Sequence, residues 1–367
     1  MNILFFAGGA YVGGMEVVVH SLMTRLNAIG HRSAAVVSGW NDGDYPARLR
    51  ASGIECHEVR LGRFYLSRPR WTLQTLGNML PAIRDIRRVA ADLRPDRVIY
   101  TEPQTLFLGS WILPHARNVL YMHSAPDRFL TGFSAELFAR KAESAVCVSS
   151  FIAQRAEQTP LKRGKITVVH NGIIQPSGDH TAPVRVPVHL GIIGELTPRK
   201  QHLTLFQAVA RLKERLPAGS FCLQVFGRTD SDYARMLQHE AARLGVQDLV
   251  RWAGFVTDRN AIYEALDIVV AASVDEPFGL TVLEAGAYRR PVVATRSGGF
   301  PEIIRENETA LLCEPGDVAS LAQALETLIV NDKLRAQLGQ AAQAYIRTRF
   351  TIERMADSFV EALRDAA

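Results

Sequence analysis

The chain has 367 residues, a formal net charge of +5 and an isoelectric point of about 9.1. Hydrophobic residues make up 47% of it and charged residues 22%, which is the composition of an ordinary globular protein. This length favours two domains and excludes a core so small that a disulfide or a metal ion must hold it together. The modest positive charge permits anionic partners such as nucleotides, phosphates or acidic lipids.

The four cysteines and the N-terminus indicate the compartment. Cys56, Cys147, Cys222 and Cys313 are scattered and form no C-x-x-C pair, so we expect free thiols in a reducing compartment. Residues 1–14 have no basic n-region and only a short apolar run, which predicts a buried first strand in place of a signal peptide. No stretch reaches the ~18 apolar residues of a membrane span. We therefore expect a cytoplasmic protein, with a peripheral position at the inner face of the plasma membrane as the alternative.

Strand-like and helical patterns alternate along the first half of the chain. Residues 2–7 are an apolar run that predicts a buried strand, and residues 8–14 are a glycine-rich turn. Residues 16–29 have helical periodicity, which Gly30 ends as a C-cap. Further strands are predicted at 33–37, 97–100, 118–122 and 145–148, with helices at 80–93 and 134–142. Continuous apolar strands joined by helices predict a parallel sheet covered on both faces.

The same rhythm restarts after residues 171–187, a segment rich in Pro, Ser, Gly and His that we take as the domain boundary. Strands are predicted at 188–193, 222–226, 250–252, 268–271 and 291–295, and helices at 203–214, 233–244, 261–265, 281–287 and 352–363. The sequence thus predicts two doubly wound α/β domains, residues 1–172 and 187–349. Ligands of such sheets bind beyond the carboxyl ends of the strands, and two domains that face each other form a cleft.

Two glutamates flank the predicted start of the helix at 281–287. Glu276 lies in the loop before this helix, and Glu284 lies within it. A helix N-terminus is a ready phosphate site, and its backbone donors here belong to Phe278, Gly279, Leu280 and Thr281. Glu284 suits the paired hydroxyls of a ribose, and Glu276 suits a second polar group of the same ligand. The alternative is two surface acids at a helix start, where acids are favoured anyway.

The loop after the strand at 188–193 contains Gly194 and carries two cations, Arg199 and Lys200. Lys200 is a compact charge that suits a diphosphate, and Arg199 can bind phosphate through two N–H groups. A solvated basic pair is the alternative, although cations are disfavoured at a helix N-terminus unless an anion is present.

Other predicted strand ends carry glycine or polar residues where a ligand would lie. The turn from Gly8 to Gly14 lacks the G-x-G-x-x-G spacing of dinucleotide-binding domains, yet it lets backbone approach a ligand closely. A tight turn without a ligand is the alternative there. His123 follows the strand at 118–122, and a hydrogen-bonded structural histidine is its alternative. Similar positions belong to Asn171, Gly172, Arg228, Phe255 and Val256, and Gly298 and Gly299 would bring backbone close to the helix at 281–287.

In order and spacing these residues resemble a known family. The chain is similar, over essentially its full length, to the GT-B fold, retaining glycosyltransferases of family 4. The most specific element is the E-x7-E motif from Glu276 to Glu284. Supporting elements are Gly13-Gly14-Met15-Glu16, His123, Asn171-Gly172, Leu196 with Lys200, and Gly298-Gly299. The resemblance implies two Rossmann-like domains and a last helix, within residues 350–367, that crosses back onto the first domain.

The resemblance also implies roles for single residues. The second domain would bind a nucleoside-diphosphate sugar, with Glu284 on the ribose and Lys200 on the diphosphate. Glu276 would hold sugar hydroxyls, and His123 would contact the transferred sugar near its anomeric carbon, so these two residues and Lys200 are the candidate catalytic groups. The remaining candidate donor contacts are Gly13, Gly14, Gly194, Arg199, Arg228, Phe255, Val256, Phe278, Gly279, Leu280 and Thr281.

One position departs from the family pattern. In the family, an arginine precedes the lysine, and this arginine binds the diphosphate. This sequence has Glu195 at the position of the arginine. A carboxylate repels a diphosphate, so either Glu195 turns away and Arg199 substitutes, or the donor differs. The family uses no metal ion, and the segments 42–44 and 230–232 match the D-x-D metal motif by letter alone.

The implied function is transfer of a sugar, with retention, from a nucleoside-diphosphate sugar to a hydroxyl acceptor, without a metal or another cofactor. UDP-sugar is the first expectation for the donor and GDP-sugar the second. Lipopolysaccharide or surface polysaccharide assembly is the expected setting. The alternatives are a transferase that acts on a small soluble acceptor, a sugar-nucleotide 2-epimerase of the same fold, and a non-catalytic nucleotide-sugar-binding protein.

A basic region between Arg60 and Arg97 belongs to the acceptor side by this resemblance. Arginines alternate with aromatic residues up to Trp71, and Arg84, Arg87 and Arg88 follow on a predicted helix. Basic amphipathic surface with aromatics can lie on an anionic membrane, as a lipid-linked acceptor would require. Solvated arginines on an exposed helix are the alternative. No nucleic-acid-binding motif is present in the sequence.

Overall fold

The computed structural model describes the whole chain except residues 10, 61–76, 127, 132–134, 179, 182 and 366–367, and it also leaves undescribed the side chains of residues 128, 129 and 138. The chain forms two compact units. Unit 1 comprises Met1–Ile174 and Ile352–Ala367, and unit 2 comprises Gln175–Thr351.

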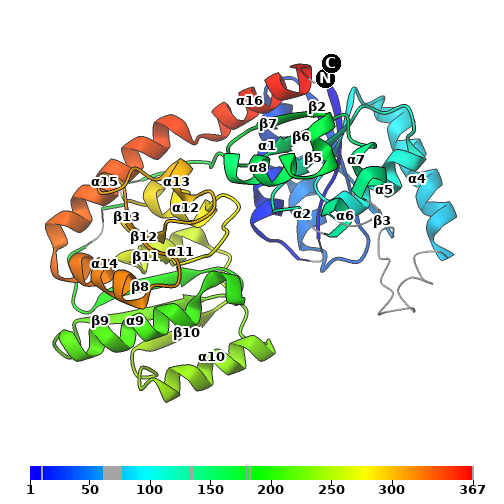
Figure 1. Cartoon of the computed structure of the whole chain (residues 1–367). Coiled ribbons are helices and arrows are strands. Elements are labelled where there is room, and N and C mark those ends of the chain that lie inside the picture. The colour runs from blue at the N-terminus through cyan, green and yellow to red at the C-terminus, as the bar shows by residue number, and fades with distance from the viewer. Residues whose placement is uncertain are drawn as a thin grey trace. The chain divides into compact units, whose positions relative to one another are not determined.

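Unit 1 is built on a seven-stranded parallel sheet in the order β3-β2-β1-β4-β5-β6-β7 (Figure 1). The strands are β1 (Asn2–Phe6), β2 (Arg32–Ser38), β3 (Glu55–Val59), β4 (Arg97–Tyr100), β5 (Asn118–Met122), β6 (Ser144–Cys147) and β7 (Lys165–Val168). The helices are α1 (Gly14–Ala28), α2 (Asp44–Ala51), α4 (Met79–Leu93), α5 (Pro103–Ile112), α6 (Arg128–Thr131), α7 (Ala135–Ala139), α8 (Ser150–Glu157) and α16 (Ile352–Asp365), with a 3-10 turn η1 (Pro160–Arg163). The strand order reverses direction between β1 and β4, where doubly wound sheets bind ligands.

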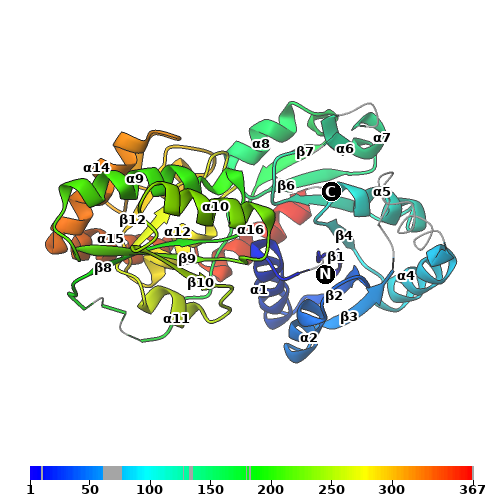
Figure 2. The same ribbon diagram turned by 90° about the horizontal axis from the view of Figure 1, so that it is seen from below.

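The sheet of unit 1 is covered by helices. Helix α1 packs against β2, α2 against β3, and α5 against β4 and β5. Figure 2 shows α2 beside the edge strand β3. Strand β4 is buried along its whole length, as is β5, and each is apolar after its polar first residue. Strands β3 and β7 lie at the two edges of the sheet and keep exposed residues.

The C-terminal helix α16 belongs to unit 1, which confirms the expected crossing of the last helix back onto the first domain. Phe359 of this helix lies against two residues of the sheet, with ring centroids 6.3 Å from Phe5 and 5.1 Å from Tyr121. The buried Arg97 donates a hydrogen bond from Nε to the carbonyl oxygen of Leu363 at 3.0 Å. These contacts tie the end of the chain to β1, β4 and β5.

Unit 2 is built on a six-stranded parallel sheet in the order β10-β9-β8-β11-β12-β13. The strands are β8 (Val188–Ile193), β9 (Phe221–Phe226), β10 (Val250–Gly254), β11 (Ile268–Ala271), β12 (Val292–Thr295) and β13 (Leu311–Cys313). The helices are α9 (His202–Arg215), α10 (Asp232–Arg243), α11 (Arg259–Glu264), α12 (Leu280–Ala287), α13 (Phe300–Ile303), α14 (Val318–Val330) and α15 (Asp332–Arg349), with a 3-10 turn η2 (Pro198–Lys200). The order reverses between β8 and β11.

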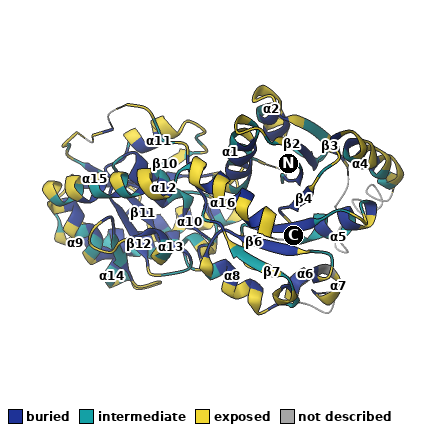
Figure 3. Ribbon diagram, turned by 90° about the horizontal axis from the view of Figure 1, so that it is seen from above, coloured by how far each residue is buried: buried dark blue, intermediate teal, exposed yellow. Residues whose placement is uncertain are grey.

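The core of each unit lies between its sheet and its helices. Figure 3 shows buried strands in both sheets and exposed outer faces on helices such as α4 and α9. In unit 2, one cluster joins the inner faces of α9 and α14 to Leu190, Leu223 and Val270 of the central strands. All four cysteines are free, and among the described residues no helix is long and apolar enough to cross a membrane.

Candidate functional site

Two cations and one carboxylate meet at the carboxyl end of the sheet in unit 2. Glu276 lies in the loop after β11, and its Oε2 accepts hydrogen bonds from Arg199 Nη1 at 2.7 Å and from Lys200 Nζ at 3.0 Å. The Glu276 side chain is 11% exposed, the Lys200 side chain 14% and the Arg199 side chain 43%. The structure therefore brings three of the sequence-predicted residues into one half-buried cluster.

The charge of Glu276 is stabilised by this pairing. Burial alone would raise the pKa of the Glu276 carboxyl, but the charges of Lys200 and Arg199 outweigh burial and leave the pKa below its ordinary value. Glu276 is therefore ionised at neutral pH. The cluster carries one net positive charge, so it can accept an anion.

The backbone of Glu276 is fixed by two glycines after β12. Gly299 donates its N–H to the carbonyl oxygen of Glu276 at 2.7 Å. Gly298 has φ +61°, and a Cβ there would collide with the backbone of Glu276. Only glycine combines that conformation with so close an approach. The expectation that these glycines bring backbone close to the start of α12 is confirmed.

Helix α12 begins beside this cluster. Gly279 is its N-cap at φ +111°, and a Cβ at that position would lie 2.7 Å from the ring of Phe300. The side chain of Phe278 is buried and lies 6.3 Å from the ring of Phe350, so it supports the loop, and its backbone alone remains a candidate for ligand contact. Leu280 and Thr281 open the helix with half-buried side chains, and the N–H groups of a first helical turn lack intrahelical acceptors.

Glu284, one turn into α12, is held by two donors from α11. Its Oε1 accepts from Arg259 Nε at 2.6 Å, and its Oε2 accepts from the hydroxyl of Tyr263 at 2.7 Å. The Glu284 side chain is 16% exposed. The carboxylate predicted to bind a ribose is thus fixed in direction and still reaches the surface.

The loop after β8 contains the position that departs from the family pattern. Gly194 has φ +141°, and a Cβ there would lie 3.3 Å from Cε of Lys200, so the lysine folds back over the strand end. Glu195 is exposed, and Arg199 stands beside Lys200 on the same carboxylate. An arginine that replaces the family's arginine as a diphosphate contact must lie beside Lys200, and Arg199 does so.

An exposed aromatic surface lies at the ends of β9 and β10. The guanidinium of Arg228 lies over the ring of Phe255 at 4.6 Å from its centroid, and Phe255 is 50% exposed. Val256 next to it is half-buried. An exposed ring backed by a cation can stack on a planar group such as a base.

The glycine turn of unit 1 is organised by Glu16, the last residue of the Gly13-Gly14-Met15-Glu16 motif. Glu16 is buried, and its carboxylate accepts the N–H of Gly9 and the N–H of Gly13, each at 2.9 Å. The N–H of Gly13 is therefore committed within the turn. Gly13 can therefore contribute to ligand contact only through the close approach of its backbone, and not through its N–H group. Gly14 is the first residue of α1.

His123 lies at the carboxyl end of β5 in unit 1. Its ring is 4.1 Å from that of Tyr121, and the hydroxyl of Tyr121 donates to Oδ1 of Asn171 at 3.3 Å. Burial lowers the pKa of the His123 imidazole to about 3, so the ring is neutral at pH 7. Its Nε2 is enclosed and has no hydrogen-bond partner among the described residues.

Family models match both units of the chain. The model described as "Glycosyltransferase Family 4" matches residues 12–174, and the model described as "Glycosyl transferases group 1" matches residues 187–345. The chain is 30% identical over 284 residues to the lipopolysaccharide core biosynthesis glycosyltransferase LpsE of Rhizobium meliloti (strain 1021), which covers 76% of this chain and 78% of that protein. The chain belongs to glycosyltransferase family 4. It is an enzyme, a glycosyltransferase of the GT-B fold.

Two further comparisons describe the range of this glycosyltransferase's relatives. A D-inositol 3-phosphate glycosyltransferase of Corynebacterium efficiens is 36% identical over 172 residues, which covers 44% of this chain and 40% of that protein. The structure of Anabaena Alr3699/HepE in complex with UDP and glucose has a TM-score of 0.79 and 22% identity, with 99% of each chain covered. The likeness to that structure supports the GT-B fold.

The segments that match D-x-D by letter have structural roles in this glycosyltransferase. Ser231 caps α10 by accepting the N–H of Ala234, and Asp232 pairs with Arg235 one turn later. Asp44 begins α2 and pairs with Arg48. Among the described residues, no group of three or more His, Cys, Asp or Glu side chains could hold a metal ion.

Sequence reasoning missed the partners of two glutamates in this glycosyltransferase. Arg259 and Tyr263 were not recognised as neighbours of Glu284, although a spacing of four places them on one face of a helix. The acceptor role of Glu16 toward Gly9 was missed as well, although a glutamate at the third position of a helix signals a capping box.

Proposed function

We propose that this glycosyltransferase transfers a sugar, with retention and without a metal ion, from a UDP-sugar to a hydroxyl acceptor in lipopolysaccharide or surface polysaccharide assembly. The observation that carries the proposal is the cluster in which Arg199 and Lys200 converge on Glu276 at the start of α12. The similarity to LpsE supports the biosynthetic setting. The UDP and glucose of the HepE structure support a UDP-sugar as the first donor to test.

The donor would bind with its diphosphate at the cationic cluster. Lys200 and Arg199 would share their hydrogen bonds between Glu276 and the phosphate oxygens, and the N–H groups that open α12 would add donors. Glu284 would accept hydrogen bonds from the ribose hydroxyls, and the base would stack near Phe255 and Arg228. Glu276 would be left to hold sugar hydroxyls.

The chemical step breaks the bond between the anomeric carbon and the phosphate oxygen. The bond from the acceptor oxygen forms on the same face of the sugar, and the leaving phosphate takes the acceptor's proton. Negative charge grows on the diphosphate, where Lys200, Arg199 and the helix N-terminus would stabilise it. His123, neutral at pH 7, would act as a hydrogen-bonding partner of the sugar and not as an acid.

The donor test begins with thermal-shift measurements against UDP, GDP, ADP and CMP sugars. We expect the UDP-sugars to raise the melting temperature most, because binding to the native state alone stabilises it. Turnover with a deacylated lipopolysaccharide core, followed by NMR of the product, then gives the anomeric configuration. A product of inverted configuration, or activity abolished by EDTA and restored by a divalent cation, would contradict the proposal.

A small soluble acceptor is the second candidate, and the similarity to the D-inositol 3-phosphate glycosyltransferase favours it. Competition between inositol phosphate and a lipopolysaccharide core in the same assay separates the two. Transfer to the inositol phosphate alone would assign the chain to soluble acceptors.

Peripheral membrane association through the basic region between Arg60 and Arg97 remains part of the proposal. Residues 61–76 of this region lie outside the described residues. On α4, Arg84, Arg87 and Arg88 are exposed, while Ala82, Ile86, Val89 and Leu93 face the core. Sedimentation with acidic liposomes should fall when salt rises and when these three arginines are replaced by glutamate. Liposome binding that is unaffected by salt and by the replacement of these arginines would contradict the membrane association.

A further inference from the structure

A buried tyrosine lies directly behind the carboxylate of Glu284. Tyr263 belongs to α11, is fully buried, and donates its hydroxyl to Oε2 of Glu284 at 2.7 Å. Arg259, one turn earlier on the same helix, donates to Oε1 at 2.6 Å. One short helix therefore fixes both oxygens of the carboxylate.

The two donors differ in how firmly they hold it. The Arg259 side chain is 44% exposed, and an exposed ion pair of a long side chain contributes little net free energy. Tyr263 has few rotatable bonds, and its side chain, which donates to a charged acceptor, is fully buried. Burial, with the charge of Glu284, raises the pKa of Tyr263 well above its ordinary value, so the hydroxyl keeps its proton and stays a donor.

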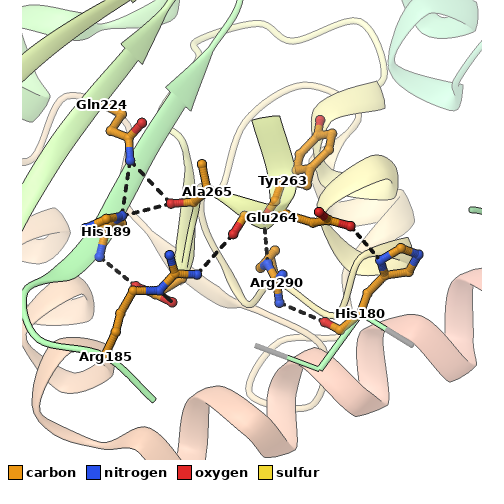
Figure 4. A network of polar contacts seen from close by, with 9 residues as sticks. His180, Arg185, His189, Gln224, Tyr263, Glu264, Ala265 and Arg290 are labelled. Carbon is orange, nitrogen blue, oxygen red and sulfur yellow. Dashed lines mark hydrogen bonds and ion pairs between the residues drawn. The ribbon is translucent and has the colours of Figure 1, made fainter. Parts of the chain in front are cut away.

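The backbone carbonyl of Tyr263 is bound by a buried arginine (Figure 4). The buried Arg290 donates from Nε to the carbonyl oxygen of Tyr263 at 2.7 Å and from Nη1 to that of His180 at 2.9 Å. The ring of Tyr263 stacks on that of Tyr288 at 5.0 Å between centroids. A buried guanidinium is costly unless its donors are satisfied, so both carbonyl groups are held to it.

The acceptor sites of Glu284 match what a ribose offers. An ionised carboxylate has about four lone-pair sites on its two oxygens. Tyr263 and Arg259 occupy one site on each oxygen, which leaves one site on each for a ligand. Two free acceptor sites, one on each oxygen, suit two neighbouring hydroxyl groups of a ribose.

We propose that Tyr263 is a positioning residue for nucleotide recognition, because its hydroxyl sets the direction in which Glu284 presents its free acceptor sites to the ribose hydroxyls. This inference rests on the proposed role of Glu284 toward the ribose. Tyr263 touches no substrate itself. Its effect should therefore appear in the discrimination between nucleotides with and without ribose hydroxyls.

The test is Tyr263→Phe in the full chain, with UDP and 2′,3′-dideoxy-UDP titrated by calorimetry. We expect the wild-type chain to bind UDP more tightly than 2′,3′-dideoxy-UDP. In the variant the ratio of the two affinities should fall about tenfold, which is the effect of one hydrogen bond to a charged group. Tyr288→Phe is the matched control, because it removes a hydroxyl from the stacked neighbour, which bonds Asn260 and not Glu284. This control should keep the wild-type preference.

The ratio of the two affinities is insensitive to partial unfolding, because an inactive fraction lowers the binding stoichiometry for both ligands alike. Glu284→Ala separates the two possible failures. If Tyr263→Phe keeps the wild-type preference for UDP and Glu284→Ala loses it, the positioning role of Tyr263 is overturned and the ribose role of Glu284 stands. A wild-type preference in Glu284→Ala itself would overturn the ribose role and this inference with it.

Discussion

The loops that follow the first strand of each unit handle charge in opposite ways. After β1, the carboxylate of Glu16 turns back into its own glycine turn and accepts the N–H groups of Gly9 and Gly13. After β8, the loop delivers the cations Arg199 and Lys200, and the carboxylate that meets them comes from the distant loop before α12.

The two loops have the same place in the topology of their units, but we infer different functions for them. The turn in unit 1 satisfies its own backbone and keeps a fixed shape, so it provides a surface for close approach. The loop in unit 2 is held through ion pairs with a separate segment, and a diphosphate can share those cations. We therefore propose that the anion site belongs to unit 2.

The largest expected effect is that of Lys200→Ala on sugar transfer. Loss of a largely buried cation that is proposed to stabilise the leaving diphosphate should lower kcat/KM about a thousandfold, or ~4 kcal/mol. Lys213→Ala is the control, because Lys213 lies on α9 and forms an exposed ion pair with Asp248. A Lys200→Ala enzyme within tenfold of wild type would break the comparison.

The next effect in size is that of Gly298→Ala on the loop that carries Glu276. A Cβ would collide with the backbone of Glu276 in a residue at φ +61°, so we expect a loss of about 3 kcal/mol in urea unfolding and weaker UDP binding. Gly316→Ala is the matched control, with φ +75° and no atom within 4 Å of the added Cβ. It should cost only about 1 kcal/mol. Equal losses in the two variants would show that the close approach to Glu276 is unimportant.

The sequence predicted much of this fold because its central strands are buried on both faces. Strands β4, β5, β8 and β11 match their predicted bounds because each consists mostly of apolar residues that are buried in the sheet. Edge strands β3 and β7 escaped prediction, since a polar strand such as Glu55–Val59 resembles a loop. Helix α14 was missed too, although Asp317 caps it.

The site was predictable in its residue types and not in its pairings. The motif spacing marked Glu276, Glu284 and Lys200, because each stands at a strand end or a helix start. That both cations meet on Glu276 depends on how two loops 76 and 77 positions apart approach each other. Local sequence carries no signal for such an approach.

Glu16→Gln sharpens the comparison from the side of unit 1. The amide would place its NH2 group toward one of the two N–H donors, so the turn should lose a hydrogen bond and about 2 kcal/mol of unfolding free energy. UDP affinity should stay within twofold of wild type, because the proposed anion site lies in unit 2. A tenfold loss of UDP affinity in a folded Glu16→Gln chain would place part of the anion site in unit 1.

The smallest expected effect is the pH dependence that His123 gives to stability. Burial lowers its pKa from 6.5 to about 3 in the folded chain, so below pH 6.5 the unfolded chain binds a proton that the folded chain does not. Stability from this group is complete above pH 6.5 and falls as pH drops toward 3. Between pH 7 and pH 5.5 the wild type should lose about 1 kcal/mol more than His123→Gln, measured by urea unfolding. Parallel losses would show that His123 titrates normally.

The most direct test of the anion site compares UDP with uridine, which lacks the diphosphate, in calorimetric titrations of the wild type and Lys200→Ala. The wild type should bind UDP far more tightly than uridine, and Lys200→Ala should lose most of that preference while its weak affinity for uridine is unchanged. An undiminished preference for UDP in Lys200→Ala would contradict the assignment of the diphosphate to the cluster of Arg199, Lys200 and Glu276.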